Sequence, residues 1–418
     1  MSEWRDVTLG EVADLLVGFA FKSARFTDDE SDPRLLRGVN IGQGSLDWSR
    51  CARWPQSDRA AYQRYELSDG DVVLAMDRPW IEAGLKRARI RSSDLPALLV
   101  QRVTRMRGTE LVRTSFIHHL VGSRRFSDYI KPIVTGVNVP HISPDQIKAF
   151  SFRLPAVRTQ DAICSVLDAI ENLIENNRRR IALLERMAQA IYREWFVHFR
   201  YPGHEDDELV DSPLGPIPVG WQTSTFSELG NYLNGFAFNP AHWGYVGLPI
   251  VKIKELKQGV TPSTRRYSGD DIGPKYRIDT GDLLFSWSAH LDAYLWSGGP
   301  ALLNQHLFKV SPTYGVSKAW LYLALRERMD EFRSRSQGTT MKHIKRAALA
   351  EVLTVTPPAP VMQAFDDAVT PVLEELLALS RVLRPLEAIR AALLPKLVTG
   401  AIDVSQLDLN ALLEESPA

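Results

Sequence analysis

Basic and amide side chains gather in stretches of the sequence where they could bind phosphate or hydrogen-bond to the edges of bases. The stretch from Arg78 to Arg107 carries eight arginines and lysines against two acids. A second group runs from Lys252 to Arg266, and a third follows the Gly-Thr-Thr turn at 338–340. Phosphates attract such groups through Coulomb forces and counterion release, although one basic patch alone is most often a solvated surface. The pattern therefore becomes informative if it recurs at equivalent positions.

Sequence motifs for catalysis are missing. There is no GxxxxGK[ST] loop, no HExxH helix and no paired Cys/His spacing for a metal. The string Asn239–His242 lacks the aromatic residue of an amino-methyltransferase tetrapeptide, and Pro144–Lys148 lacks the second carboxylate of a nuclease. The neighbouring His118 and His119 should point to different sides of a helix as ordinary surface and core residues. We therefore expect a binding module with no catalytic residue, metal or cofactor of its own.

The elements that would position these side chains occur twice. Residues 4–21 (WRDVTLGEVADLLVGFAF) match residues 221–238 (WQTSTFSELGNYLNGFAF). Further matches follow in the same order: 70–77 with 281–288, Gln101 with Gln305, and 135–155 with 338–358, which pairs His141 with His343. A collinear series of this kind indicates an ancestral duplication.

Each half ends in a long helical pattern. Residues 160–199 contain no Gly or Pro and carry two apolar seams with seven-residue spacing. The counterpart at 361–398 has the same spacing but contains Pro371, Pro385 and Pro395, so we expect it to be bent or broken. The first pair of seams is Leu167, Ile174, Ile181, Ala188 and Trp195 with Ile170, Asn177, Leu184 and Ile191. The second pair is Phe365, Val372, Leu379, Leu386 and Leu393 with Val369, Leu376, Leu383 and Leu397.

Two such stripes in one chain can pair with each other. We expect an intramolecular antiparallel coiled coil with Asn177 in its seam, and a pseudo-twofold relation between the halves. The alternative is that each helix packs only on its own globular segment. The globular segments mix short β-rich runs and helices without βαβ alternation, which is typical of an α+β fold.

The 418 residues carry no net charge, but this balance hides an uneven distribution. The globular segments 1–154 and 221–356 have net charges of +4 and +5, and the segments 155–220 and 357–418 have −4 and −5. Cys51 and Cys164 are far apart in the sequence and fit reduced thiols. The N-terminus lacks the apolar core of a signal peptide, and no stretch is apolar enough to span a membrane, so we expect a cytoplasmic protein.

Several of these strings together resemble the DNA-specificity subunit of Type I restriction–modification systems. They are GFAF after a Trp in each half, Gln101-Arg102-Val103, Asn304-Gln305-His306, GTTMKHI at 338–344, IYREWFVHFRYPG at 191–203 and LLPKLVTGAIDV at 393–404. The resemblance covers essentially the whole chain. It implies target-recognition domains at 1–154 and 221–356, helical spacers at 155–201 and 357–405, a linker at 202–220 and a tail at 406–418.

The resemblance also implies a function and partners. Each recognition domain would read one half of a bipartite double-stranded DNA site, and the helices would fix the gap. The chain would recruit two modification subunits, which methylate adenine N6, and restriction subunits that use ATP. It would itself catalyse nothing. The alternatives are a partner-binding decoy with degenerate recognition domains, and a stand-alone DNA-modifying enzyme.

Candidate contact residues follow from side-chain chemistry and from the resemblance. The phenylalanines of the two GFAF strings (Phe19, Phe21, Phe236 and Phe238) fit domain core better than base contact. Candidates for partner binding are Tyr192, Trp195, Phe196, Leu394 and Leu397; intramolecular packing is the alternative for the aromatic pair Trp195–Phe196. Candidates for DNA binding are Lys22, Arg78, Lys86, Arg87, Arg89, Arg91, Gln101, Arg102, Asn138, His141, Lys252, Lys254, Lys257, Arg265, Arg266, Ser288, His290, Gln305, His306, Thr340, Lys342, His343 and Lys345.

Overall fold

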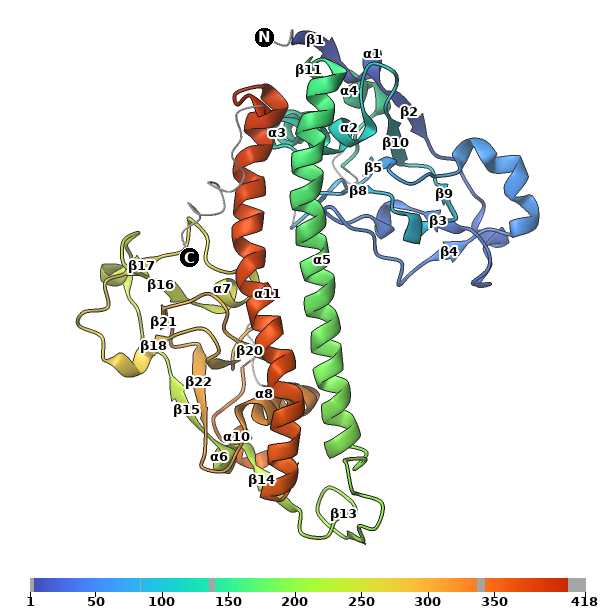
Figure 1. Cartoon of the computed structure of the whole chain (residues 1–418). Helices are drawn as coiled ribbons and strands as arrows, with labels where there is room; N and C mark the ends of the chain where they lie inside the picture. The colour runs from blue at the N-terminus through green and yellow to red at the C-terminus, as the bar shows by residue number, and fades with distance from the viewer. Residues whose placement is uncertain (1–3, 83, 135–139, 337–342, 405–418) are drawn as a thin grey trace. The chain divides into compact units, whose positions relative to one another are not determined.

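The computed structural model describes residues 4–82, 84–134, 140–336 and 343–404. Internal contacts divide this part of the chain into a first unit, which runs to Leu173 and resumes at Glu387, and a second unit from Ile174 to Leu386. The long helices α5 (Val157–Phe196) and α11 (Ala359–Thr399) each contribute one end to each unit (Figure 1). The remainder of each unit is an α+β domain.

The first unit is built on two small sheets. The larger has the strand order β2-β10-β5-β8, and the smaller, β4-β3-β9, contains one parallel pair, β3 with β9. Short pairs join β1 to β11 and β6 to β7. The strands are β1 (Arg5–Thr8), β2 (Asp14–Val17), β3 (Arg34–Leu36), β4 (Ala52–Arg53), β5 (Val72–Ala75), β6 (Trp80–Ile81), β7 (Gly84–Leu85), β8 (Arg87–Arg89), β9 (Ala97–Leu99), β10 (Val103–Arg107) and β11 (Ser151–Leu154).

The second unit repeats this topology. Its main sheet has the order β15-β22-β19-β20, its second sheet β17-β16-β21-β18 also has four strands and again one parallel pair, β16 with β21, and β14 pairs with β23. The predicted duplication is thus confirmed in the order of the main sheet and in the single parallel pair, but where the second unit has β18 the first unit has an isolated bridge between Glu66 and Leu98. The strands are β12 (Leu209–Val210), β13 (Ile217–Pro218), β14 (Gln222–Thr225), β15 (Gly230–Asn234), β16 (Leu248–Val251), β17 (Arg266–Tyr267), β18 (Arg277–Ile278), β19 (Leu283–Ser286), β20 (Asp292–Leu295), β21 (Ala301–Leu303), β22 (Leu307–Pro312) and β23 (Leu353–Thr356).

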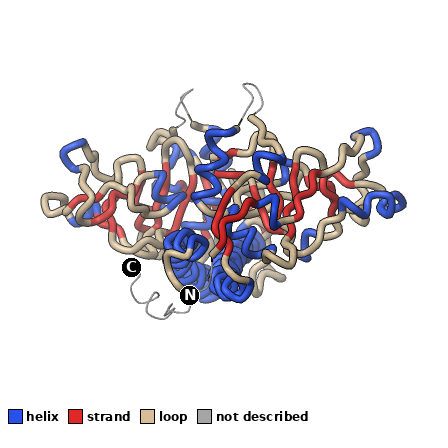
Figure 2. The backbone as a smooth tube through the Cα atoms, turned by 90° about the horizontal axis from the view of Figure 1, so that it is seen from above, coloured by secondary structure: helices blue, strands red, loops and turns tan. Residues whose placement is uncertain are grey.

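Short helices begin where the sequence supplies caps. Thr8 N donates to Glu11 Oε2 at 2.6 Å and Thr225 N donates to Glu228 Oε2 at 2.7 Å, so both repeats open with the same capping arrangement. In each unit the sheets lie beside the long helices and do not surround them (Figure 2). The short helices are α1 (Leu9–Val12), α2 (Thr114–Val121), α3 (Arg124–Ile133), α4 (Pro144–Lys148), α6 (Phe226–Leu229), α7 (Ile253–Gln258), α8 (Lys318–Glu327), α9 (Met329–Ser334) and α10 (Ala348–Glu351).

The long helices α5 and α11 pair in opposite directions. In the first unit Glu171 Oε1 accepts from Arg390 Nη2 at 2.9 Å, and in the second unit Glu375 accepts from Arg180. Asn177 is buried, with 7% of its surface exposed, as expected for a polar residue in the seam. The predicted antiparallel pairing is therefore present within each unit.

The second helix was expected to be bent or broken, and the structure shows that it is not broken. α11 runs without interruption through Pro371, Pro385 and Pro395. A proline inside a helix removes one hydrogen bond and costs about 3 kcal/mol. Burial of its neighbours, such as Leu386 and Leu393, offsets that cost, because each buried leucine contributes about 2 kcal/mol.

The units do not separate the helices from the globular segments, since the dividing line crosses both α5 and α11. The segment between α5 and β14, expected to be a linker, contains the short pair β12 and β13. None of the helices in the described ranges combines the length and apolar character needed to cross a membrane.

Candidate nucleic-acid interface

A cluster of polar side chains lies where β5 ends in the first unit. Asp77 Oδ2 accepts from Arg102 Nη1 at 2.7 Å, and Asp77 Oδ1 lies 2.6 Å from His141 Nδ1. Arg102 has a positive φ of 67° and its side chain is 66% exposed, so the guanidinium is held at the surface. Asp77 thus gathers two basic side chains that are distant from it in sequence.

Further basic and amide groups border this cluster. Burial, and then the charge of Arg78, lower the pKa of Lys86, which places the two cations close together. Gln101 is exposed, and its N–H donates to Phe19 O at 2.8 Å, so the first GFAF loop supports it. We call this surface the first edge: Asp77, Arg78, Lys86, Gln101, Arg102 and His141.

The second unit has a matching surface. The β-bridge between Asp77 and His141 has its counterpart between Ser288 and His343, the residues that the sequence repeat aligns with them. Gln305 N donates to Phe236 O at 3.0 Å, as Gln101 N does to Phe19 O. The second edge consists of Ser288, His290, Gln305, His306 and His343.

A close backbone approach explains why both loops carry glycine. A Cβ on Gly18 would lie 2.3 Å from Val100 O, and a Cβ on Gly235 would lie 2.3 Å from Asn304 O. Any side chain there would push the loop away from the strand end that bears Gln101 or Gln305. The repeated GFAF string is therefore a support for the edge. Of its phenylalanines, Phe21 is core, with 6% exposed, whereas Phe19 remains 37% exposed.

The second edge is less charged than the first. Ser288 is 1% exposed and its Oγ lies 3.4 Å from His306 Nδ1. Gln305 Nε2 lies 3.4 Å from His306 Nε2, so the amide and the imidazole stand side by side. Burial, and then the charge of Lys257, lower the pKa of His290.

Basic residues of the second unit surround the loop between Asn239 and Gly247. The Lys252 ammonium lies over the ring of Trp243 at 5.1 Å, and the Arg265 guanidinium lies over the ring of Tyr245 at 4.7 Å. Arg266 Nη1 donates to Gly247 O at 2.9 Å. The remaining candidates Lys22, Lys254, Lys257 and Lys345 are exposed. Arg91 is half-buried, and Asn138, Thr340 and Lys342 lie outside the described residues.

Two of the DNA-binding candidates face inward, which corrects their assignment. Arg87 is 6% exposed, burial lowers its pKa to about 10, and its guanidinium packs against Gly122. Arg89 Nη1 donates to Asp168 Oδ1 of α5 at 2.9 Å. Neither guanidinium is placed to meet a phosphate. Alternation along β8 could have flagged Arg87, but only the packing of α5 shows where both residues point.

His118 and His119 also depart from expectation, because both face α5. His118 Nε2 lies 2.7 Å from Glu171 Oε2, and His119 Nε2 lies 2.9 Å from Asp168 Oδ1. Burial lowers the pKa of His118 to about 4, so the imidazole is neutral. Burial acts to raise the pKa of Glu171, but the hydrogen bond from His118 and the Arg390 charge hold it well below its usual range. We call Arg87, Arg89, His118, His119, Asp168, Glu171 and Arg390 the ionic network.

The ionic network contains a set of possible metal ligands. Among the described residues, His118, His119 and Glu171 bring ligand atoms within 4.8 Å of one another. Arg390 already pairs with Glu171, and the buried Arg87 adds a further positive charge nearby. A divalent cation would meet this charge in a buried site, so the arrangement fits an ion-pair network and does not fit a metal centre.

Four of the five partner-binding candidates are buried in the protein interior, and Trp195 is partly buried. Tyr192 and Phe196 are 2% and 4% exposed, and Phe196 packs edge-on against Phe365 of α11 with ring centroids 4.7 Å apart. Trp195 packs on the same cluster. Leu394 and Leu397 are 5% and 0% exposed. Intramolecular packing, the alternative stated for the aromatic pair, is what the structure shows for all five.

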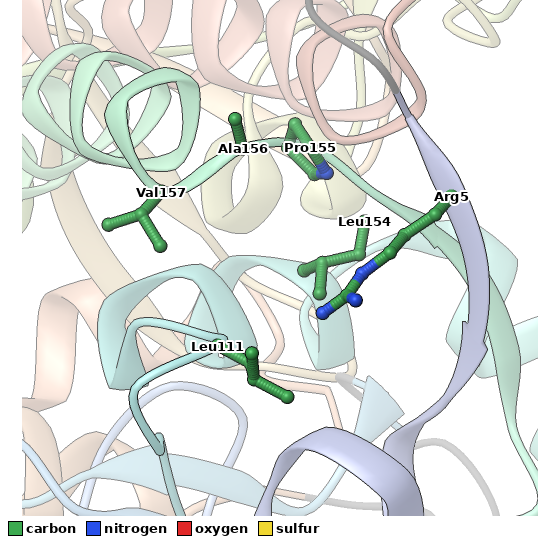
Figure 3. Close-up of a pocket in the computed structure, with 6 residues that line it drawn as sticks. All are labelled: Arg5, Leu111, Leu154, Pro155, Ala156 and Val157. Atoms are coloured by element: carbon green, nitrogen blue, oxygen red, sulfur yellow. The ribbon is translucent and has the colours of Figure 1, made fainter.

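A small cavity lies at the start of α5. Its volume is about 140 Å³, and it is lined by Leu111, Leu154, Pro155, Ala156 and Val157, with the side chain of Arg5 beside it (Figure 3). Ligand pockets are usually above about 300 Å³. This space has room for a few water molecules and lies apart from both edges.

Two equivalent polar edges in a duplicated fold, joined through a shared pair of helices, define the class of two-domain DNA-recognition proteins. The family model of the Type I restriction modification DNA specificity domain matches residues 1–186 and 218–364. The chain belongs to this family. It is a specificity subunit, which confers DNA sequence specificity and is distinct from the catalytic subunits.

Relatives agree with this assignment over most of the chain. The HindI specificity subunit of Haemophilus influenzae is 22% identical over 96% of this chain and 100% of its own length. The MjaIX specificity subunit of Methanocaldococcus jannaschii is 24% identical over 71% of each chain. The crystal structure of a Type I S subunit from M. genitalium matches the fold with a TM-score of 0.63, over 95% of this chain and 96% of that one, at 12% identity.

Proposed function

We propose that the first edge reads one half of a bipartite DNA site and the second edge reads the other half. The observation that carries this proposal is the equivalence of the two surfaces. Each has a bridged pair, Asp77–His141 or Ser288–His343, and a glutamine, Gln101 or Gln305, whose N–H donates to the first phenylalanine of the GFAF string. Two copies of one surface in one chain fit two short half-sites separated by an unread gap.

Side-chain chemistry distinguishes residues that contact bases from residues that contact phosphates. Gln101, Arg102, Gln305 and His306 are proposed to face base edges, because amides, guanidinium groups and imidazoles discriminate donors from acceptors in the major groove. The lysines neutralise phosphates and so position the protein without reading sequence. They are Lys22 and Lys86 in the first unit and Lys252, Lys254, Lys257 and Lys345 in the second.

The helices α5 and α11 are proposed to fix the gap between the half-sites and to hold the partners. Two modification subunits, which methylate adenine N6, and the restriction subunits would assemble on the chain in the cytoplasm, where the DNA is. The side chains available on the helices are the exposed apolar ones, since four of the five candidates named from the sequence are buried and Trp195 is partly buried. The exposed residues are Leu173, Leu183, Met187 and Val382, which are 44% to 51% exposed.

The test is single-molecule sequencing of N6-methyladenine in host DNA, with and without this chain. We expect methylation of one bipartite motif with a fixed gap to depend on the chain. A methylation map that does not change when the chain and its modification subunit are co-expressed in a naive host would contradict the proposal. A partner-binding decoy would give that result while still assembling with the modification subunit.

A further inference from the structure

The loop of the second unit between the GFAF string and β16 exposes large apolar side chains. Trp243, Tyr245 and Val246 are 44%, 62% and 85% exposed within four consecutive residues. Single exposed apolar residues are common, but a contiguous group at a surface marks a site of interaction. We call residues 239–247 the aromatic loop.

The aromatic loop is held firmly at its base. The His242 ring meets those of Phe236 and Tyr267 edge-on, with centroids 5.5 Å and 5.0 Å away. Gly244 and Arg266 exchange two backbone hydrogen bonds of 3.0 Å and 2.9 Å. Gly247 has a φ of 95°, and a Cβ there would lie 2.4 Å from Tyr267 O. The exposed rings therefore belong to a supported loop, which reduces the entropy lost when a ligand orders them.

A cationic side chain lies over each of the two exposed rings. Lys252 lies over Trp243 at 5.1 Å, and Arg265 lies over Tyr245 at 4.7 Å. Lys252 directly follows Val251, whose carbonyl oxygen accepts from Asn304 N at 3.1 Å, and Gln305 comes next in the sequence. The aromatic loop and the second edge are thus neighbours. Flat rings interleaved with positive charge suit a ligand that presents phosphates beside sugars and bases.

The corresponding loop of the first unit has the opposite character. Residues 22–33 contain Asp28, Asp29, Glu30 and Asp32, which would repel phosphate. The guanidinium of Arg25 in this loop lies over the ring of Trp54, at 4.9 Å, and Trp54 itself is 1% exposed. In this loop the ring beneath the cation is therefore buried, so an anionic ligand at the surface could not contact both.

We propose that Trp243 and Tyr245 are specificity-determining residues for the half-site read by the second unit. This inference rests on the proposed function. Their rings, with Val246, make apolar contacts to base edges and deoxyribose, and Lys252 and Arg265 neutralise the flanking phosphates. Apolar contacts of this kind favour thymine, which presents a methyl group in the major groove. The first unit reads its half-site without a loop of this type.

The test is selection of DNA from a pool of random duplexes by the full chain. Wild type is compared with the double variant Trp243→Ala/Tyr245→Ala and with Tyr245→Ala alone. Tyr314→Ala is the matched control, because Tyr314 is a fully exposed aromatic residue of the same unit on the turn between β22 and α8. Thermal unfolding of each variant shows whether the fold is retained.

The expected result is that wild type selects a bipartite motif and the double variant loses information in one half only. Its affinity for the wild-type duplex should fall about tenfold to a hundredfold. The dependence of affinity on salt should stay the same, because no charge was removed, whereas Lys252→Met should lower the logarithmic salt slope by about 1. Tyr314→Ala should bind as wild type does.

Three outcomes would overturn the inference. A double variant that selects the full motif with unchanged affinity would show that the aromatic loop does not read DNA, while the proposed function stands. An equal loss in Tyr314→Ala would show that the effect is not specific to the loop. A wild-type chain that selects no motif would overturn the proposed function and this inference with it.

Discussion

The two units share a topology but are attached to the long helices by different chemistry. In the first unit, α2 meets α5 through the ionic network, in which His118 and His119 pair with Glu171 and Asp168. In the second unit, α8 meets the helices through aromatic rings: Trp320 and Phe196 pack at 6.2 Å. A duplicated fold has thus kept its strand order while its interior changed from charge pairing to apolar packing, or the reverse.

This difference predicts two kinds of sensitivity. Aromatic packing depends on volume and is indifferent to pH, whereas an ion-pair network depends on charge and tolerates changes of volume. Four substitutions or conditions test this comparison.

Removal of the Phe365 ring should break the attachment of the second unit. Phe365 is fully buried against Phe196 and Trp195. Phe365→Ala should lower the free energy of unfolding by about 4 kcal/mol, because the substitution removes buried ring contacts and leaves a cavity. Urea denaturation measures this change. Val382→Ala, an exposed site on the same helix, is the control and should change stability by less than about 0.5 kcal/mol; a similar loss in both variants would contradict the argument.

Removal of the Glu171 carboxylate should break the attachment of the first unit. Glu171→Ala leaves His118 and Arg390 without their acceptor in a largely buried site. The free energy of unfolding should fall by about 3 kcal/mol. Hydrogen exchange measured on peptides of α2 and α8 should show the loss of protection in α2 first. A variant Glu171→Leu that is more stable than wild type would show that the network costs stability.

Mild acid should destabilise the first unit more than the second. Burial lowers the pKa of His118 to about 4, below the ordinary value near 6.5. Between these values the unfolded chain binds a proton that the folded chain does not, so stability is full above pH 6.5 and falls as the pH drops toward 4. The slope is at most about 1.4 kcal/mol per pH unit.

The measurement is urea denaturation at about pH 7 and about pH 5, with His118→Gln beside wild type. The variant should lose less stability on acidification, because it lacks the group that titrates. The paired carboxylate Asp168 adds a second loss at lower pH: burial opposes the shift, but hydrogen bonds from His119 and Ser115 lower its pKa to about 2. Equal pH slopes in wild type and variant would contradict the assignment to His118.

The smallest effect on stability is expected at the surface. Asp77→Ser gives the first edge the residue that the second edge has at Ser288. Because the Arg102 side chain is 66% exposed, loss of its ion pair should cost less than about 1 kcal/mol. DNA selection should nevertheless change at one half-site, since Asp77 orients Arg102 and His141. An unchanged motif would show that Asp77 does not shape the reading surface.

The sequence predicted the duplication and the equivalence of the edges because both depend on local strings. The alignment of Asp77 with Ser288 and of His141 with His343 is confirmed by matching β-bridges. The seven-residue spacing likewise predicted many of the buried residues of α5 and α11, including Asn177, although other seam positions such as Ile181 and Leu383 are half-buried. Such patterns repeat along one element and need no knowledge of the elements packed against it.

The errors arose where a second secondary-structure element determines whether a side chain is buried or exposed. Arg87 and Arg89 look like phosphate ligands until α5 covers them. His118 and His119 both face α5, which adjacency on a helix alone does not predict. Local geometry at Pro385 predicts a bent or broken helix. The helix stays unbroken because burial along α11 stabilises it by more than the lost hydrogen bond costs. Sequence reasoning also missed Asp168 and Glu171, whose role depends on residues more than forty positions away.

Among the described residues, the first unit is completed by the segment from Glu387 onward, whereas the second is one stretch from Ile174 to Leu386. During translation the ribosome must therefore add more than two hundred further residues after Leu173 before Arg390, the second partner of Glu171, exists. At about 5–20 residues per second this is a delay of roughly 10–40 s. Synthesis of the first unit therefore starts before that of the second unit and ends after it. Until Arg390 has been added, the nascent first unit exposes the carboxylate of Glu171 without that ion pair.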